Sequence, residues 1–171
     1  MRRSTKLQII IKEKLDSHFP DVIIEWNMAK EAKDAFSPSQ TRYAPRLDLA
    51  VGPFNITPEH KQHKIEDEFF SLSPKKLIDD FDSKALRQNP NPRCALGIEV
   101  VCSGSSKHIL GDFTNASMMG LYGISVPDKP MLNKVRRIFE YVKILKTVGK
   151  SPPNLLSNLT ILSLEDFFDL I

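Results

Sequence analysis

The stretch GIEVVCSGSSKHILGDFTNASMMG, residues 97–120, decides the fold. It starts as an apolar strand, breaks into a serine-rich turn and continues as a helix rich in small residues. Glu99 lies in the strand between Ile98 and Val100, where a carboxylate is costly to bury without a partner. The sequence therefore predicts either that something neutralises Glu99 or that Glu99 binds a ligand.

The segments that follow this stretch alternate between strand and helix patterns. Residues 121–127 are apolar and predict a strand, and residues 129–149 carry apolar side chains at helical spacing. The chain closes with a strand and a short helix that Ser163 is placed to cap. This alternation predicts parallel strands joined by crossover helices.

The segments that precede it predict a different arrangement. Residues 4–18 have helical spacing, residues 21–28 and 46–52 are strands, and residues 29–45 form a polar link. Residues 55–94 hold short amphipathic pieces between prolines, which predicts a mostly helical insertion. We expect one α/β domain over residues 1–171, with a mixed β-sheet, an antiparallel first half and helices on both faces.

Composition describes an ordinary globular chain, with 41% hydrophobic and 26% charged residues and a net charge of only +3. Charge is unevenly spread, since residues 128–150 hold seven Lys or Arg against two Asp or Glu. The N-terminal apolar run LQIII is too short for a signal peptide or a membrane span. Two cysteines make no disulfide framework, so we expect a cytoplasmic protein with no membrane partner.

Two nearly apolar strands each present one carboxylate. In RLDLAVG, residues 46–52, Asp48 points away from the face of Leu47 and Leu49, and Glu99 is alone in its strand. If the strands are neighbours, the two acids meet at one edge of the sheet, where they would recruit a cation. Oxygen ligands suit Mg²⁺ or Mn²⁺, and Lys107 at the start of the next helix is close enough to reach the same place.

The segments YAPRLDLAVGPF and LGIEVVCSGSSKHILGDFTNASMMGLYGISV resemble the PD-(D/E)XK nuclease superfamily, which has the restriction-endonuclease-like fold. The pattern E-x-x-x-S-G-S-x-K-H-x-x-G-D-x-x-N-A is similar to an uncharacterised prokaryotic branch of that superfamily. The resemblance covers roughly residues 1–150. It implies a core of one helix, three strands, a second helix and a further strand, with the helical insertion at about residues 55–94.

The resemblance also implies roles for individual residues. Asp48 and Glu99 would hold the metal ion together with the backbone carbonyl of Val100. The lysine of the motif belongs two residues after the glutamate, where this chain has Val101. Lys107 is then the natural candidate to orient or deprotonate the attacking water, or to stabilise charge.

Auxiliary roles fall to residues around this centre. Glu25, on the first strand, could be an added ligand or could orient water. The turn offers Ser103, Ser105 and His108, whose hydroxyl, backbone and ring groups suit phosphate oxygens. Predicted contacts with the nucleic acid are Lys107 and three cations of the basic helix, Arg136, Arg137 and Lys143.

The sequence thus predicts a Mg²⁺- or Mn²⁺-dependent endonuclease that hydrolyses phosphodiester bonds of DNA. A homodimer of such an enzyme could cut both strands. A first alternative is a module that keeps the fold, has lost the chemistry and binds nucleic acid or a protein partner. Val101 in the place of the lysine favours this alternative. A second alternative is a metal-independent enzyme that uses His108.

Overall fold

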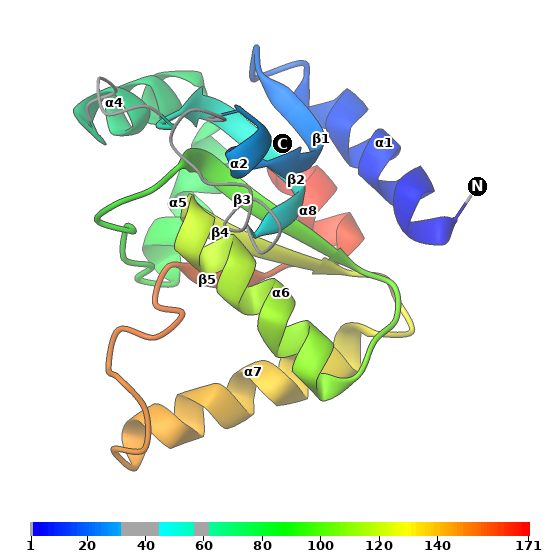
Figure 1. Ribbon diagram of the computed structural model, residues 1–171, viewed down its shortest axis with the longest axis vertical. Coiled ribbons are helices and arrows are strands. Elements are labelled where there is room, and N and C mark those ends of the chain that lie inside the picture. The colour runs from blue at the N-terminus through cyan, green and yellow to red at the C-terminus, as the bar shows by residue number, and fades with distance from the viewer. Residues whose placement is uncertain (1, 32–44, 57–61) are drawn as a thin grey trace.

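The computed structural model describes residues 2–31, 45–56 and 62–171, and it is an α/β protein built on one five-stranded mixed sheet (Figure 1). The predicted polar link falls largely in residues 32–44, outside the described residues. The strands follow one another across the sheet in chain order: β1 (Val22–Asn27), β2 (Arg46–Phe54), β3 (Cys94–Val101), β4 (Gly120–Pro127) and β5 (Leu159–Ile161).

The described helices lie between and around these strands. They are α1 (Arg3–Leu15), α2 (Met28–Glu31), α4 (Gln62–Leu72), α5 (Lys75–Ser83), α6 (Ser106–Met119), α7 (Leu132–Thr147) and α8 (Leu164–Leu170). None of the helices in the described part of the chain is long and apolar enough to cross a membrane. Ser163 caps α8 as predicted, because its hydroxyl accepts the Asp166 N–H at 3.0 Å.

Strand directions confirm the predicted mixture. β1 pairs with β2 and β2 with β3 in antiparallel fashion, whereas β3, β4 and β5 are parallel. Every residue of β3 and β4 is buried, which explains their apolar composition. One boundary differs from the prediction, because β2 continues beyond Gly52 to Phe54. An irregularity in its pairing between Val51 and Phe54 accommodates Pro53, which has no N–H to donate.

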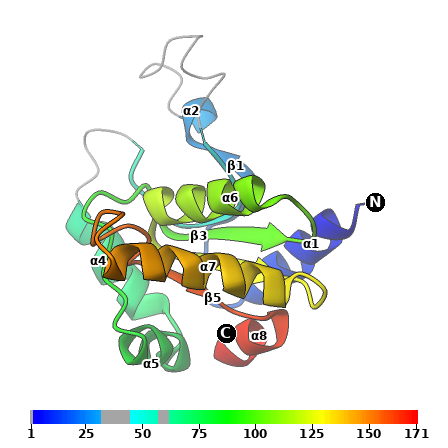
Figure 2. The same ribbon diagram turned by 90° about the horizontal axis from the view of Figure 1, so that it is seen from below.

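Helices cover both faces of the sheet, and Figure 2 shows α6 on one side of β3 with α5 and α8 on the other. Helices α6 and α7 share a core that includes Phe113 and Val135. The opposite face is covered by α1, α4, α5 and α8, whose buried side chains form the largest core cluster. Right-handed crossovers from β3 to β4 and from β4 to β5 place α6 and α7 on the same face.

The segment predicted as a mostly helical insertion contains α4 and α5, but it is not an excursion from the core. Ile65 and Phe69 of α4 and Leu77 and Phe81 of α5 are all at most 1% exposed. They join the same cluster as α1 and β3. The proline-bounded amphipathic pieces therefore close one face of the sheet, because an uncovered apolar face would be left in water.

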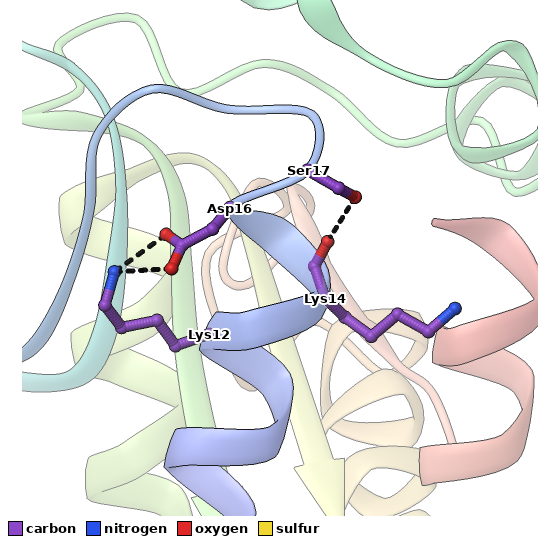
Figure 3. A network of polar contacts seen from close by, with 4 residues as sticks. All are labelled: Lys12, Lys14, Asp16 and Ser17. Atoms are coloured by element: carbon purple, nitrogen blue, oxygen red, sulfur yellow. Dashed lines mark hydrogen bonds and ion pairs between the residues drawn. The ribbon is translucent and has the colours of Figure 1, made fainter.

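Helix α1 lies beside β1 and aims one face inward, with Gln8, Ile11 and Leu15 buried. Polar groups at its C-terminal end make contacts at the surface (Figure 3): Lys12 Nζ pairs with Asp16 at 2.7 Å, and Ser17 Oγ donates to the Lys14 carbonyl. Gln8 is the exception on the inner face, a polar side chain that is 2% exposed. A buried amide requires partners, and those partners belong to the candidate site.

Helix α6 packs very close to β3. A Cβ added at Gly97 would lie 2.8 Å from the Ala116 carbonyl oxygen, which is shorter than a carbon–oxygen contact allows. The small side chain of Ala116 permits this close approach. The expectation that small residues let this helix sit on the sheet does not hold at Gly111, where an added Cβ would meet open space. The close approach brings the side chains of α6 down onto the face that carries Glu99.

Candidate active site

The two carboxylates that the sequence singled out meet at the end of the pairing between β2 and β3. The last residue pair there is Leu49 with Ile98, and Asp48 and Glu99 are the next residues beyond it. Asp48 Oδ2 accepts the backbone N–H of Val100 at 2.8 Å. In return, the Glu99 carboxylate is hydrogen-bonded by the Asp48 backbone. Side chains thus replace the backbone ladder and hold the two acids together.

Burial and neighbouring negative charges raise the pKa of both acids. Glu99 is 5% exposed, and its pKa is raised to about 10 by burial and then by the negative charges of Asp48 and Asp112. Hydrogen bonds from Asn115 and the Asp48 backbone act in the opposite direction. Burial also raises the pKa of Asp48, against its hydrogen bond with Val100. Without a cation, Glu99 is therefore protonated at neutral pH.

Helix α6 supplies a third acid that the sequence reasoning missed. His108, Asp112 and Asn115 line the same cavity from one face of the helix. Burial raises the pKa of Asp112 to about 6; the nearby charge of Asp48 also raises it, and His108 lowers it. A signal existed in the sequence, since positions 108, 112 and 115 follow the i, i+4, i+7 spacing of one helix face just after the Glu99 strand.

The cavity in front of these acids has a volume of about 560 Å³ and is open to solvent on one side. Its rim carries two cations, Arg2 at the start of the chain and Arg46 at the start of β2. Neither cation was predicted as a site residue. Ser103 and Val100, two of the predicted site residues, also line it. The arrangement combines an acidic floor with a basic rim.

Several observations test whether this floor fits a divalent cation. Within the described residues, Asp48, Glu99 and Asp112 form no ion pair with a lysine or an arginine, and Glu99 Oε1 is buried with no hydrogen-bond partner. A cation bound there would supply the missing charge and the missing contact. No group of three or more His, Cys, Asp or Glu side chains in the described part is arranged to hold a metal ion. The fit is thus to two carboxylates, with the rest of the coordination from backbone or water.

Glu25, the predicted auxiliary acid, lies beside Asp48 but is already engaged. Its Oε2 pairs with Arg46 Nε at 3.1 Å, and its Oε1 accepts from Gln8 Nε2 at 2.9 Å. The same Gln8 nitrogen donates to Asp48 Oδ1 at 2.7 Å. Gln8 was not predicted as a site residue, because a lone glutamine in an amphipathic helix carries no sequence signal.

The structure does not bring Lys107 into the cavity. Lys107 is exposed on the first turn of α6, and among the described residues the lining includes its neighbour His108 instead. Ser105 has a structural role, since its hydroxyl caps α6 by accepting the His108 N–H at 3.3 Å. Val101 is 1% exposed and packs in the core with Phe113, so a core side chain stands where the resemblance implied a lysine.

The predicted nucleic-acid contacts on α7 lie outside this cavity. Lys143 pairs with Glu140 at 2.8 Å and lies 4.9 Å from the centre of the Phe139 ring. Arg136 lies 3.9 Å from Asp166, and Arg136 and Arg137 line a separate hollow along α7. The basic helix therefore forms a surface of its own rather than a wall of the acidic cavity.

Comparisons with known proteins add nothing to this geometry. No protein-family model, no curated protein and no solved structure matches the chain. The functional argument therefore depends on the cavity and on the residues that line it.

Proposed function

We propose that the protein is a metal-dependent nuclease that hydrolyses phosphodiester bonds of DNA, as the resemblance to PD-(D/E)XK nucleases implies. One observation carries the proposal: Asp48 and Glu99, 51 positions apart in the chain, converge at the end of β2 and β3 with no cationic partner among the described residues. Buried acids of this kind are a signature of functional sites rather than of stable cores.

Asp48 Oδ, the free Glu99 Oε1 and the Val100 carbonyl would hold a Mg²⁺ or Mn²⁺ ion. Such an ion, when bound, polarises a phosphoryl oxygen and lowers the pKa of a bound water. Glu99 gives up its proton when the ion binds, because a carboxylate must be ionised to act as a ligand. This assignment uses only side chains that lie at the floor of the cavity.

The rim of the cavity is suited to a phosphodiester. Arg2 and Arg46 would neutralise phosphate oxygens, and Ser103 offers a hydroxyl donor beside Val100. His108 lies at the same rim next to Asp112, where its ring can donate to phosphate or accept a proton from water. His108 could therefore take the role that the sequence predicted for Lys107, which is to orient or deprotonate the attacking water. An exposed Lys107 would contact the nucleic acid farther from the reacting phosphate.

The decisive experiment is a nicking assay on supercoiled plasmid DNA with Mg²⁺ or Mn²⁺. Asp48→Asn and Glu99→Gln should lower the rate at least 100-fold, whereas Asp79→Asn should leave it unchanged. Asp79 is a matched control, because it is an exposed acid that pairs with Lys75 on α5. Equal rates in all four proteins would reject the proposal. RNA and single-stranded DNA in the same assay define the substrate. Sedimentation tests for the homodimer, and the appearance of linear plasmid in the nicking assay would show that both strands are cut.

A second candidate function is a nucleic-acid-binding or protein-binding module that lost the chemistry. The observation that favours it is the packing of Val101, which leaves no lysine at the expected place. Such a module would show no carboxylate-dependent Mn²⁺ binding, while any affinity for DNA would fall steeply with salt. Under either function, the expected cytoplasmic location stays part of the proposal.

A further inference from the structure

A row of carboxylates crosses three adjacent strands at the candidate site. The pairs Ile24 with Leu49 and Trp26 with Leu47 place Glu25 opposite Asp48. Glu99 follows on β3, one residue beyond the pair formed by Leu49 and Ile98. Three neighbouring carboxylates offer two gaps, one between Glu25 and Asp48 and one between Asp48 and Glu99. Each gap has the donor chemistry of a divalent-cation position.

The two gaps are not equivalent. The side-chain amide nitrogen of Gln8 lies in the first gap, 2.9 Å from Glu25 Oε1 and 2.7 Å from Asp48 Oδ1. Both of its hydrogens are therefore donated to carboxylates. The Gln8 amide oxygen is buried and has no partner within the described residues, so the nitrogen contacts alone set the orientation of the amide.

The backbone of Glu25 supports the same distinction. Glu25 has a φ of 54°, a left-handed conformation that a residue with a side chain adopts only at a cost. In this conformation its second oxygen, Oε2, pairs with Arg46. Gln8 and Arg46 each contact one oxygen of Glu25, and Glu25 is not among the described residues that line the cavity. Glu99 differs, because its Oε1 has no partner in the described part of the chain.

From these contacts we infer that Gln8 is a positioning residue that takes the place of a cation between Glu25 and Asp48 and so limits the carboxylate row to a single metal ion, held between Asp48 and Glu99. The inference rests on the proposed metal site and adds its stoichiometry. A neutral amide donates to two carboxylates without adding a charge. It thereby fixes the Asp48 carboxylate while leaving its remaining lone pairs to the ion.

The test counts Mn²⁺ ions bound to the full chain by isothermal titration calorimetry, with electron paramagnetic resonance as an independent count. Wild-type protein should bind one ion. Glu25→Gln should also bind one, with an affinity within threefold of wild type, because Glu25 is not a ligand. Glu13→Gln is the matched control, since Glu13 is an exposed acid on α1.

Gln8→Glu is the gain-of-site variant. It exchanges the donor for a carboxylate of the same shape, so it should bind two ions, and Gln8→Glu combined with Glu25→Gln should return to one. Any of three results would overturn the role of Gln8. The wild type could bind two ions, Glu25→Gln could lose more than tenfold in Mn²⁺ affinity, or Gln8→Glu could bind a single ion. If Gln8→Glu fails to fold in a thermal melt, the wild-type and Glu25→Gln counts decide the question. A wild type that binds no Mn²⁺ would instead remove the metal site and the proposed function with it.

Discussion

Asp48 and Glu99 hold each other at the place where β2 and β3 separate. The Asp48 carboxylate takes the Val100 N–H at 2.8 Å, and the Glu99 carboxylate is hydrogen-bonded by the Asp48 backbone. The two acids are thus fixed by the backbone of the opposite strand rather than by a lysine or an arginine. Such an arrangement orients both acids but, among the described residues, brings no positive charge to them. Ionising Glu99 is therefore costly to the fold, and a bound cation would remove that cost.

This cost should appear in the pH dependence of stability. The folded pKa of Glu99, about 10, lies above its ordinary value of 4.5, so the folded protein retains a proton that the unfolded chain loses between these values. The stabilising contribution is full below about pH 4.5 and is lost as the pH rises toward about 10. Glu99→Gln stays neutral throughout, so it should be more stable than wild type at pH 8 by up to about 5 kcal/mol and equally stable near pH 4. Urea unfolding in EDTA measures the difference, and parallel pH profiles would contradict it.

Two glycines, Gly97 in β3 and Gly111 in α6, should respond oppositely to substitution by alanine. Gly97→Ala places a Cβ 2.8 Å from the Ala116 oxygen, so α6 must move and the free energy of unfolding should fall by about 1–3 kcal/mol. Gly111→Ala meets open space inside α6 and should raise it by about 0.5–1 kcal/mol. Urea denaturation of the two variants measures both effects. A neutral Gly97→Ala would show that α6 is not held against β3 by close contact.

The candidates for proton transfer can be separated by a pair of variants. His108 lines the cavity and Lys107 does not, although they are neighbours on the same turn. In the nicking assay His108→Ala should lower the rate at least tenfold, whereas Lys107→Ala should change it less than threefold at low salt. A large loss in Lys107→Ala with an unaffected His108→Ala would restore the role that the sequence gave to the lysine.

Restoring the motif lysine at position 101 should not restore chemistry. Val101 is 1% exposed and packs with Ile109 and Phe113, so Val101→Lys would bury an ammonium group among apolar side chains. We expect this variant to lose about 3 kcal/mol or more of stability, clearly more than Val101→Ala. Chemical denaturation of both variants gives the comparison. If Val101→Lys were stable and cleaved DNA faster than wild type, position 101 would belong to the active site rather than to the core.

Much of the fold was readable from local pattern. The apolar β3 strand, the helix with its apolar stripe at α7 and the alternation after Glu99 predicted the mixed sheet, because burial on one or both faces imposes its own periodicity. Asp48 and Glu99 could be singled out for the same reason, since a charged side chain in an apolar strand breaks that periodicity. The packing of α4 and α5 in the core could not be predicted, because an amphipathic pattern indicates that a helix buries one face but not which element covers that face.

The surroundings of the two acids depend on how the elements pack. Gln8 comes from α1, Arg46 from the start of β2 and Asp112 from α6, and none of them departs from the pattern of its own segment. Local sequence pattern was enough to predict the main elements and the two conspicuous carboxylates. Chain packing determined that Gln8 fills one gap between carboxylates and that Lys107 faces solvent, because contacts across a fold depend on where elements meet and not on the residues within any one of them.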